Sequence, residues 1–362
     1  MNYAQRQERL RDALRASKAQ ALLVTHLPNV RYLCGFTGSS GVLAFSLKRG
    51  AMQSAFFTDG RYTTQARDEV KRSRVVVAEK PALTAALRWL SSARAASVAI
   101  EAEHVTVAGL ASIRKGLGRS VRIQNTSGMV ERLRMVKEPD EIKILRKAVL
   151  LGASLFDVAL RKIWPGATEA SIAGEMEHAA RKAGAEGMSF DTIVASGKRS
   201  ALPHGRASQA KVPARGFCIL DFGVILAGYC SDMTRTLYVG APDRRSAAMY
   251  DAVKEAQLAG IASVQAGVTA EEVDRATRRV LDKAGFGRFF THSTGHGVGL
   301  EIHEPPRLGD KQPEVLQPGM VITIEPGIYV PGIGGVRIED MVVVTERGCE
   351  VLTPTTKDLI VI

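Results

Sequence analysis

The 362-residue sequence lacks any long hydrophobic run. No apolar stretch approaches the roughly 20 residues that a membrane-spanning helix needs. The first 20 residues, MNYAQRQERLRDALRASKAQ, alternate charged residues with Ala and Leu instead of carrying the apolar core of a signal peptide. We therefore expect a cytoplasmic protein without a membrane partner.

Cysteine is also scarce, with four residues in the chain. Cys34, Cys218, Cys230 and Cys349 show no C-x-x-C spacing, which excludes a zinc knuckle and a disulfide framework. We interpret them as buried free thiols. A phosphate-binding loop is missing too, because GFTGSSG at residues 35–41 is followed by neither a P-loop lysine nor a dinucleotide fingerprint. We interpret this stretch as a turn.

Acidic residues are few in the first third of the chain. Residues 1–130 hold 20 Lys and Arg against 8 Asp and Glu, whereas residues 131–362 hold 29 of each, so the net charge of +12 lies entirely in the first part. This asymmetry supports two domains. A basic domain can bind nucleic acid, but no motif of an RNA or DNA reader is present. We interpret the charge as solvated, Arg-rich helices and expect no nucleic-acid partner.

The hydrophobic pattern divides at the same place. Residues 1–126 alternate helical and strand patterns, with six strand-like runs from ALLVT to VRIQN, which predicts an α/β domain. The segment MVERLRMVKEPDEIKILRKAV then opens a long helix. Further helices are predicted over 169–182, 241–266 and 270–284. Residues 127–362 therefore form a second, α+β domain with a largely antiparallel sheet.

Two segments of the second domain read as short β-hairpins that carry acidic residues. The first is ILDFGVILAGYCSDMTRTLYV, residues 219–239. A turn centred between Leu226 and Ala227, with Gly228 supplying the bend, sets Asp221 directly opposite Asp232.

The second segment is VITIEPGIYVPGIGGVRIEDMVVV, residues 321–344. A turn centred on Gly332 sets Glu325 opposite Glu339. Like charges directly opposed across two strands are destabilising. Two such pairs in otherwise apolar strands need a compensating cation, and a divalent metal is the economical one.

A histidine-rich loop, HSTGHGVGLEIHE at residues 292–304, lies between the hairpins and contains His292, His296 and His303. Imidazole with carboxylate suits manganese, iron, cobalt or zinc better than calcium. One imidazole and four carboxylates exceed what a single tetrahedral ion takes up, and they fit two metals with bridging carboxylates. Any one of these histidines alone is more often structural, but the conjunction with D-x10-D, E-P-G and E-D is specific. The residues predict a two-metal hydrolytic site.

The same motifs resemble a known family. ASGKRSALPHG, the DFG and GYCSDMTRT segments, HSTGHGVGLEIHE, IEPGIY and GVRIED are similar to the pita-bread metallopeptidases, specifically the proline-specific branch of aminopeptidase P and prolidase. The resemblance covers residues 131–362, and the preceding α/β domain is similar to the N-terminal domain of that branch. It implies a C-terminal pita-bread (creatinase/aminopeptidase-like) catalytic domain behind a smaller α/β domain.

The resemblance also assigns the metal ligands. It makes Asp221 a ligand of one metal, His296 and Glu325 ligands of the other, and Asp232 and Glu339 the bridges. All five residue types are present, whereas metal-free relatives lack part of this set. Two divalent ions per chain are implied, with manganese preferred and cobalt, zinc or iron as alternatives.

Further residues match positions of the family that act on the substrate. The catalytic residues implied are His204, His292, His303, Glu325 and Arg337. His204 and His303 are expected to contact the substrate, and Arg307 to hold its carboxylate. One departure is Arg199, which stands in the ASG loop where many relatives have Asn.

Three hypotheses about function follow. The favoured one is a metallopeptidase that hydrolyses Xaa-Pro bonds, at the N-terminus of peptides or in dipeptides, between which the motifs do not decide. The second is a metal-dependent hydrolase or aminopeptidase without proline preference, and the third is a metal-free binding module on the same fold. The expected partners are short proline-containing peptides and a second copy of the chain in a homodimer.

Overall fold

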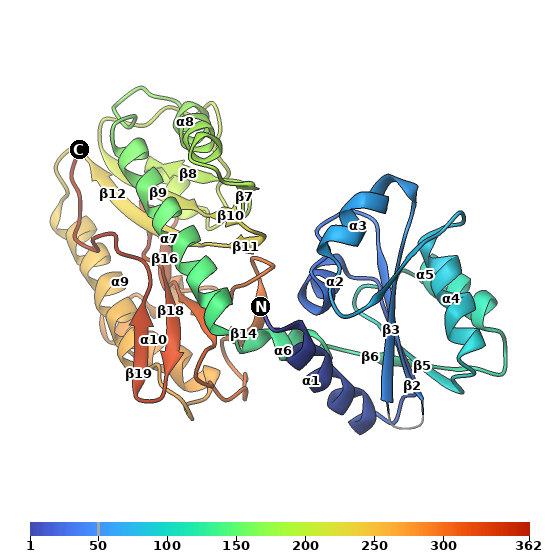
Figure 1. Cartoon of the computed structure of the whole chain (residues 1–362). Helices are drawn as coiled ribbons and strands as arrows, with labels where there is room; N and C mark the ends of the chain where they lie inside the picture. The colour runs from blue at the N-terminus through green and yellow to red at the C-terminus, as the bar shows by residue number, and fades with distance from the viewer. Residues whose placement is uncertain (49–50) are drawn as a thin grey trace. The chain divides into compact units, whose positions relative to one another are not determined.

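The computed structural model describes residues 1–48 and 51–362. Its contacts divide the chain into two compact units, Met1–Arg134 and Met135–Ile362 (Figure 1). The boundary expected from the sequence, after residue 126, lies at the end of strand β6 (Arg122–Thr126), eight residues before this division. In the described parts of both units, no helix is long and apolar enough to cross a membrane.

The first unit is built on a six-stranded sheet with the order β4-β3-β2-β1-β5-β6. β1 pairs antiparallel with β2, and β2 with β3, while the outer strands join in parallel. The strands are β1 (Ala21–Val24), β2 (Val42–Lys48), β3 (Ala51–Thr58), β4 (Arg74–Val77), β5 (Ser97–Glu101) and β6. These are the six strands that the sequence predicts, so the α/β interpretation of this domain is confirmed.

Five α-helices lie wholly within the described part of this unit. They are α1 (Tyr3–Ala16), α2 (Leu27–Cys34), α3 (Thr63–Glu69), α4 (Ala82–Ser92) and α5 (Val107–Leu117). The sequence pattern did not predict α2 and α5. α5 holds Gly109 and Gly116, which lower helix propensity, yet Thr106 caps it by accepting a hydrogen bond from the backbone N–H of Gly109.

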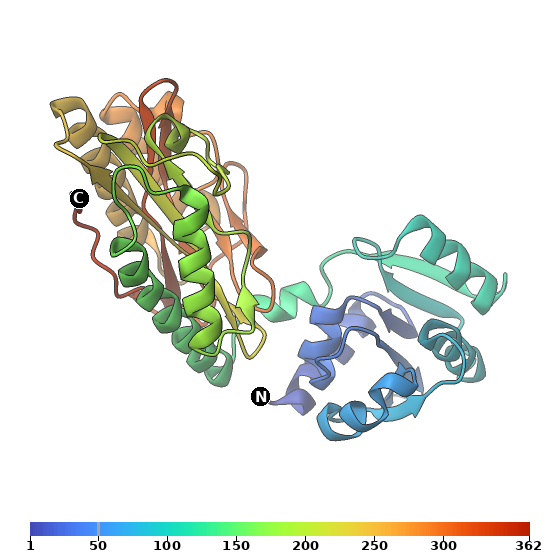
Figure 2. The ribbon, with the colours of Figure 1, turned by 90° about the horizontal axis from the view of Figure 1, so that it is seen from above.

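The second unit places its strands between two helix pairs, as the view from above shows (Figure 2). α7 packs on α8 and α9 packs on α10. Its helices are α6 (Glu131–Met135), which crosses the boundary, α7 (Pro139–Leu160), α8 (Glu169–Lys182), α9 (Arg244–Ser263) and α10 (Ala270–Lys283). The single long helix expected near residue 130 is wrong. Pro139 disfavours a helical conformation at Glu138, and a capping box formed by Glu138 and Glu141 starts α7 as a separate helix.

The main sheets of this unit have the orders β12-β9-β8 and β14-β13-β15-β18-β19. Two smaller sheets have the orders β11-β10-β7 and β16-β17. Their bounds are β7 (Gly187–Met188), β8 (Ile193–Ser196), β9 (Gly216–Phe222), β10 (Val224–Leu226), β11 (Tyr229–Cys230), β12 (Met233–Val239), β13 (Gly295–Gly297), β14 (Glu304–Leu308), β15 (Val321–Ile324), β16 (Gly327–Val330), β17 (Gly334–Arg337), β18 (Asp340–Thr345) and β19 (Gly348–Val351). The antiparallel α+β interpretation is confirmed.

The first acidic hairpin has a different register from the one expected. Ala227 and Gly228 both have positive φ, 47° and 76°, which makes them the two central residues of a type I′ turn. The turn therefore lies one residue later, and Asp221 pairs with Thr234 instead of Asp232. A displacement of two residues along a strand keeps a side chain on the same face, so both aspartates still point the same way.

The second acidic hairpin has the predicted register. Ile324 pairs with Asp340, and Gly327 pairs with Arg337. The register is the same on both sides of the intervening residues, so Glu325 lies opposite Glu339. Both hairpins meet at a bridge between Thr234 and Glu339, where the Glu339 N–H donates to the Thr234 carbonyl at 3.1 Å.

Candidate metal centre

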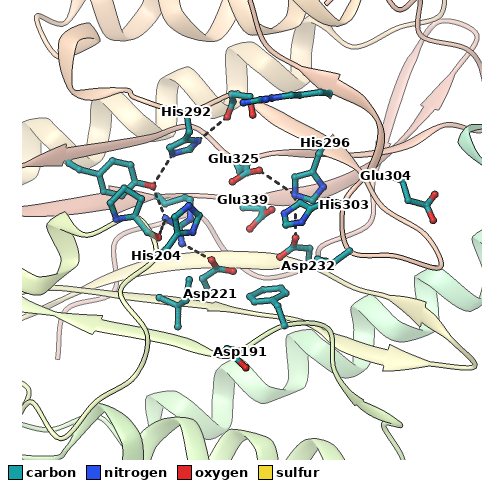
Figure 3. Close-up of a pocket in the computed structure, with 18 of the residues that line it drawn as sticks. Asp191, His204, Asp221, Asp232, His292, His296, His303, Glu304, Glu325 and Glu339 are labelled. Carbon is teal, nitrogen blue, oxygen red and sulfur yellow. Dashed lines mark hydrogen bonds and ion pairs between the residues drawn. The ribbon is translucent and has the colours of Figure 1, made fainter. Parts of the chain in front are cut away.

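Four carboxylates and one imidazole converge at the ends of these strands (Figure 3). Asp221 stands near the end of β9, Asp232 between β11 and β12, Glu325 directly after β15, and Glu339 directly before β18, while His296 lies in β13. They face a cavity of about 1080 Å³. Asp232, Glu325 and Glu339 thus lie just outside strands, whereas Asp221 and His296 lie within them.

The carboxylate oxygens present free ligand positions. Asp232, His296 and Glu339 offer ligand atoms that all lie within 4.8 Å of one another. Oδ1 of Asp221 and Oδ1 of Asp232 are buried, and neither has a hydrogen-bond partner among the described residues. Buried polar atoms are normally paired. Orphaned carboxylate oxygens beside an imidazole fit a group of divalent cations, and the donor set is the oxygen and nitrogen mixture that transition metals accept.

Electrostatics at the centre point in the same direction. Burial raises the pKa of Asp232 and of Glu339 well above the ordinary range, and neighbouring carboxylates raise both further. Burial raises the pKa of Glu325 to about 8, and Asp221 adds to that effect. Without added positive charge the carboxylates resist ionising together. A metal cation is the group that would stabilise their charged forms.

His296 has the tautomer that a metal ligand needs. Its Nδ1 lies 3.0 Å from the Gly297 carbonyl oxygen, which can only accept, so the proton resides on Nδ1. Nε2 then carries a lone pair and lies 3.4 Å from Oε1 of Glu325 and 3.6 Å from Oδ2 of Asp232. Burial, with His303 nearby, lowers the pKa of His296 to about 4. The ring is neutral at physiological pH.

Arg337 supplies a buried positive charge at the edge of the carboxylates. Its Nη2 donates to Oδ2 of Asp221 at 2.6 Å, and its Nη1 donates to the Tyr329 hydroxyl at 2.6 Å. The Tyr329 hydroxyl lies 2.9 Å from Nε2 of His292, whose Nδ1 faces the Ser293 carbonyl at 2.9 Å. The carbonyl assigns the ring proton to Nδ1, so the tyrosine donates to Nε2. His292 is thereby tied to Asp221 through Tyr329 and Arg337.

Two residues that the sequence did not single out hold the ligand strands together. The Thr234 hydroxyl donates to Oε2 of Glu339 at 2.7 Å. The next residue, Arg235, is buried and donates from Nη1 to the carbonyls of Thr234 and Glu339 at 2.8 and 2.6 Å. It also donates to Oδ1 of Asp340 at 2.7 Å. Both follow Asp232 within the motif SDMTRT, but their partners depend on the register of the hairpin.

α10 fixes the loop that carries His292. Oδ1 of Asp274 accepts hydrogen bonds from the N–H and hydroxyl of Thr294 at 3.1 and 2.7 Å. Arg278, one turn later, donates to Oδ2 of Asp274 and to the His292 carbonyl, each at 2.6 Å. The Thr294 carbonyl in turn accepts the N–H of Glu325 at 2.8 Å. One face of α10 therefore positions both His292 and the backbone at Glu325.

The structure brings every site residue named from the sequence to the same cavity. The lining residues include His204, Asp221, Asp232, His292, His296, His303, Arg307, Glu325, Arg337 and Glu339. His204, His303 and Arg307 are exposed, whereas the acidic residues are buried or, for Glu325, half-buried. The sequence did not single out Tyr329, although it belongs to the motif IEPGIY. Arg199 is bound elsewhere, 3.0 Å from the buried carboxylate of Glu169.

Comparison with known proteins places the chain in a family. Residues 143–346 match metallopeptidase family M24, and residues 6–136 match the creatinase/prolidase N-terminal domain. The chain therefore belongs to metallopeptidase family M24 and carries the N-terminal domain of the creatinases and prolidases. The expected pita-bread catalytic domain behind a smaller α/β domain is confirmed.

Individual relatives cover the whole chain. An uncharacterized peptidase, YqhT, from Bacillus subtilis (strain 168) is 39% identical over 355 residues, 98% of this chain and 99% of the relative. The solved structure of an Xaa-Pro dipeptidase from Bacillus anthracis has a TM-score of 0.96 at 41% identity and covers 100% of both chains. That of an X-Pro aminopeptidase from Thermotoga maritima MSB8 has a TM-score of 0.88 at 35% identity, covering 97% of this chain and 100% of the other.

Proposed function

We propose that the protein hydrolyses Xaa-Pro bonds with two divalent metal ions, manganese being preferred. The observation that carries the proposal is the buried group of four carboxylates with His296, in which two oxygens have no partner among the described residues. Asp221, Asp232, His296, Glu325 and Glu339 would hold the ions. When bound, the ions would polarise the scissile carbonyl and lower the pKa of the attacking water.

The protein's own residues would then handle protons and charge. The carboxylate of Glu325 takes the proton that the water loses. The neutral imidazole of His303 donates to the carbonyl oxygen as negative charge develops on it. His204, which lines the cavity and is exposed, passes a proton to the leaving nitrogen. The bond before proline has no N–H, so the site needs no acceptor there.

Proline preference is supported by the relatives with solved structures, which are an Xaa-Pro dipeptidase and an X-Pro aminopeptidase. Arg307 is proposed to bind the substrate carboxylate. It lines the cavity and is exposed, and its backbone pairs with His296 in the sheet. A homodimer remains a prediction.

The test uses full-length protein stripped of metal by a chelator, then supplied with Mn²⁺, Co²⁺ or Zn²⁺. We expect no turnover before metal is added, and an Xaa-Pro dipeptide to be cleaved at least about tenfold faster than the matched Xaa-Ala dipeptide afterwards. A matched Xaa-Pro tripeptide separates dipeptidase from aminopeptidase, and Arg307→Ala should impair the dipeptide more. Equal rates on the proline and alanine dipeptides would support the metal-dependent hydrolase without proline preference. Failure to bind metal would support the metal-free binding module.

A further inference from the structure

Lys137 and Glu304 form an ion pair that the proposed chemistry does not use. Nζ of Lys137 lies 3.2 Å from Oε2 of Glu304, and their side chains are 1% and 3% exposed. Glu304 directly follows His303 and lines the cavity, but it lies apart from the other labelled carboxylates (Figure 3). A buried pair of this kind is seldom kept for stability alone, since apolar replacements are often as stable. Its position beside His303 suggests another role.

The Glu304 carboxylate fills the inside of the loop that ends at His303. Its Oε1 accepts the N–H of Glu301 at 3.1 Å. A Cβ atom at Gly299 would lie 2.6 Å from Oε2, so the carboxylate occupies the space that a side chain at position 299 would need. The backbone of Glu304 pairs with Gly297. The loop from Gly299 to His303 is therefore closed around this carboxylate.

Lys137 is itself held by the sheet. Its N–H donates to the Gly319 carbonyl at 2.9 Å, and its neighbour Val136 forms a bridge with Met320. The Gly319 N–H donates a hydrogen bond to the Val344 carbonyl at 2.9 Å. The backbone of Lys137 is therefore anchored beside Met320 and the strand that contains Val344, and from there its ammonium group reaches Glu304.

His303 depends on this support. Among the described residues its side chain has no hydrogen bond, and its ring contact is with His296, 4.4 Å between centroids. Its backbone therefore decides where the imidazole lies. We propose that Lys137 is a positioning residue which, through Glu304, holds His303 at the reacting carbonyl. The inference rests on the proposed function, in which His303 stabilises the developing charge.

The test compares Lys137→Met with Lys143→Met in metal-loaded enzyme. Lys143 is a matched control because its side chain is 75% exposed on α7. Lys137→Met should lower kcat on an Xaa-Pro dipeptide about tenfold, with KM and metal content unchanged, and should speed amide exchange in residues 299–303. In a His303→Ala background, Lys137→Met should lower kcat no further. Losses that multiply would overturn the proposal.

A second variant guards against failure to fold. Lys137→Met with Glu304→Gln removes both charges, and such replacements are often neutral for stability. Wild-type kcat and wild-type amide exchange in this double variant would show that the pair only neutralises charge. If His303→Ala alone turns over normally, the proposed role of His303 fails, and the unchanged metal requirement would show that the peptidase proposal survives.

Discussion

The carboxylates of the candidate metal centre differ in how far their oxygen atoms are already hydrogen-bonded. Asp221 and Asp232 each keep one buried oxygen without a partner among the described residues. Glu339 differs, because the Thr234 hydroxyl binds its Oε2 and the Arg235 guanidinium binds its backbone carbonyl. The side chain and the backbone of Glu339 are therefore both held in place by neighbouring residues.

Glu339→Gln keeps the shape of the side chain and removes its charge. We expect the metal-free variant to be more stable than metal-free wild type at pH 8, because one of several mutually repelling buried carboxylates is gone. The stabilisation gained on adding Mn²⁺ should shrink at the same time, since a ligand is lost. Unfolding midpoints with and without metal, together with elemental analysis, measure both effects. Two tightly bound ions in the variant would contradict the assignment.

The sequence predicted the residues that converge at the candidate centre, but not the residues that hydrogen-bond to them. Each candidate ligand lies in a sequence motif that is specific enough to identify it without coordinates. Thr234 and Tyr329 act through partners 105 and 37 residues away. Those partners depend on strand register and packing, which no local pattern encodes.

At the scale of elements, one hairpin could be placed from the sequence and the other could not. The turn of the second hairpin is centred on Gly332, as the sequence predicted. The first requires Ala227 to adopt φ of 47°, which non-glycine residues seldom do. Its turn position was therefore misjudged. The glycine of the DFG motif is required for another reason, because a Cβ at Gly223 would lie 1.8 Å from the Ser231 carbonyl oxygen.

α10 was predicted almost to the residue, and its packing gives a test. Asp274→Ala should leave the buried N–H and hydroxyl of Thr294 without their acceptor, lowering the free energy of unfolding by about 1–3 kcal/mol. The control is Glu271→Ala on the same helix, whose ion pair with Arg275 is exposed and should contribute under about 1 kcal/mol. Urea unfolding at pH 7 compares them. Equal losses would show that Asp274 does not hold the His292 loop.

At the scale of the whole molecule, the metal-free protein should lose stability as pH rises from 6.5 to 8. Asp232, Glu325 and Glu339 have raised pKa values, that of Glu325 about 8, so the folded state keeps protons that the unfolded state releases. Lowered pKa values of His292 and His296, both about 4, act oppositely, but only below about pH 6.5. Above that pH the carboxylates decide the sign.

Thermal unfolding of chelator-treated protein at pH 6.5 and 8.0 measures this dependence. The midpoint should fall with rising pH, and added Mn²⁺ should raise it more at pH 8.0, where fewer protons have to leave the ligands. A midpoint that stays level or rises with pH in the absence of metal would mean that other groups of the protein already stabilise the ionised form of the buried carboxylates.

The contacts of Arg235 also determine at which stage of protein synthesis the site can be completed. This side chain, which holds the Glu339 carbonyl, is itself held by the carbonyls of Thr355 and Thr356 at 2.7 and 2.8 Å. Asp221 leaves the ribosome long before them, and at about 5–20 residues per second the interval lasts roughly 7 to 27 seconds. Until Glu339 has been synthesised, the nascent chain lacks one of the five proposed ligands, and until Thr356 follows, Arg235 lacks carbonyls that hold it. The proposed ions would therefore find the complete site only after that point of synthesis.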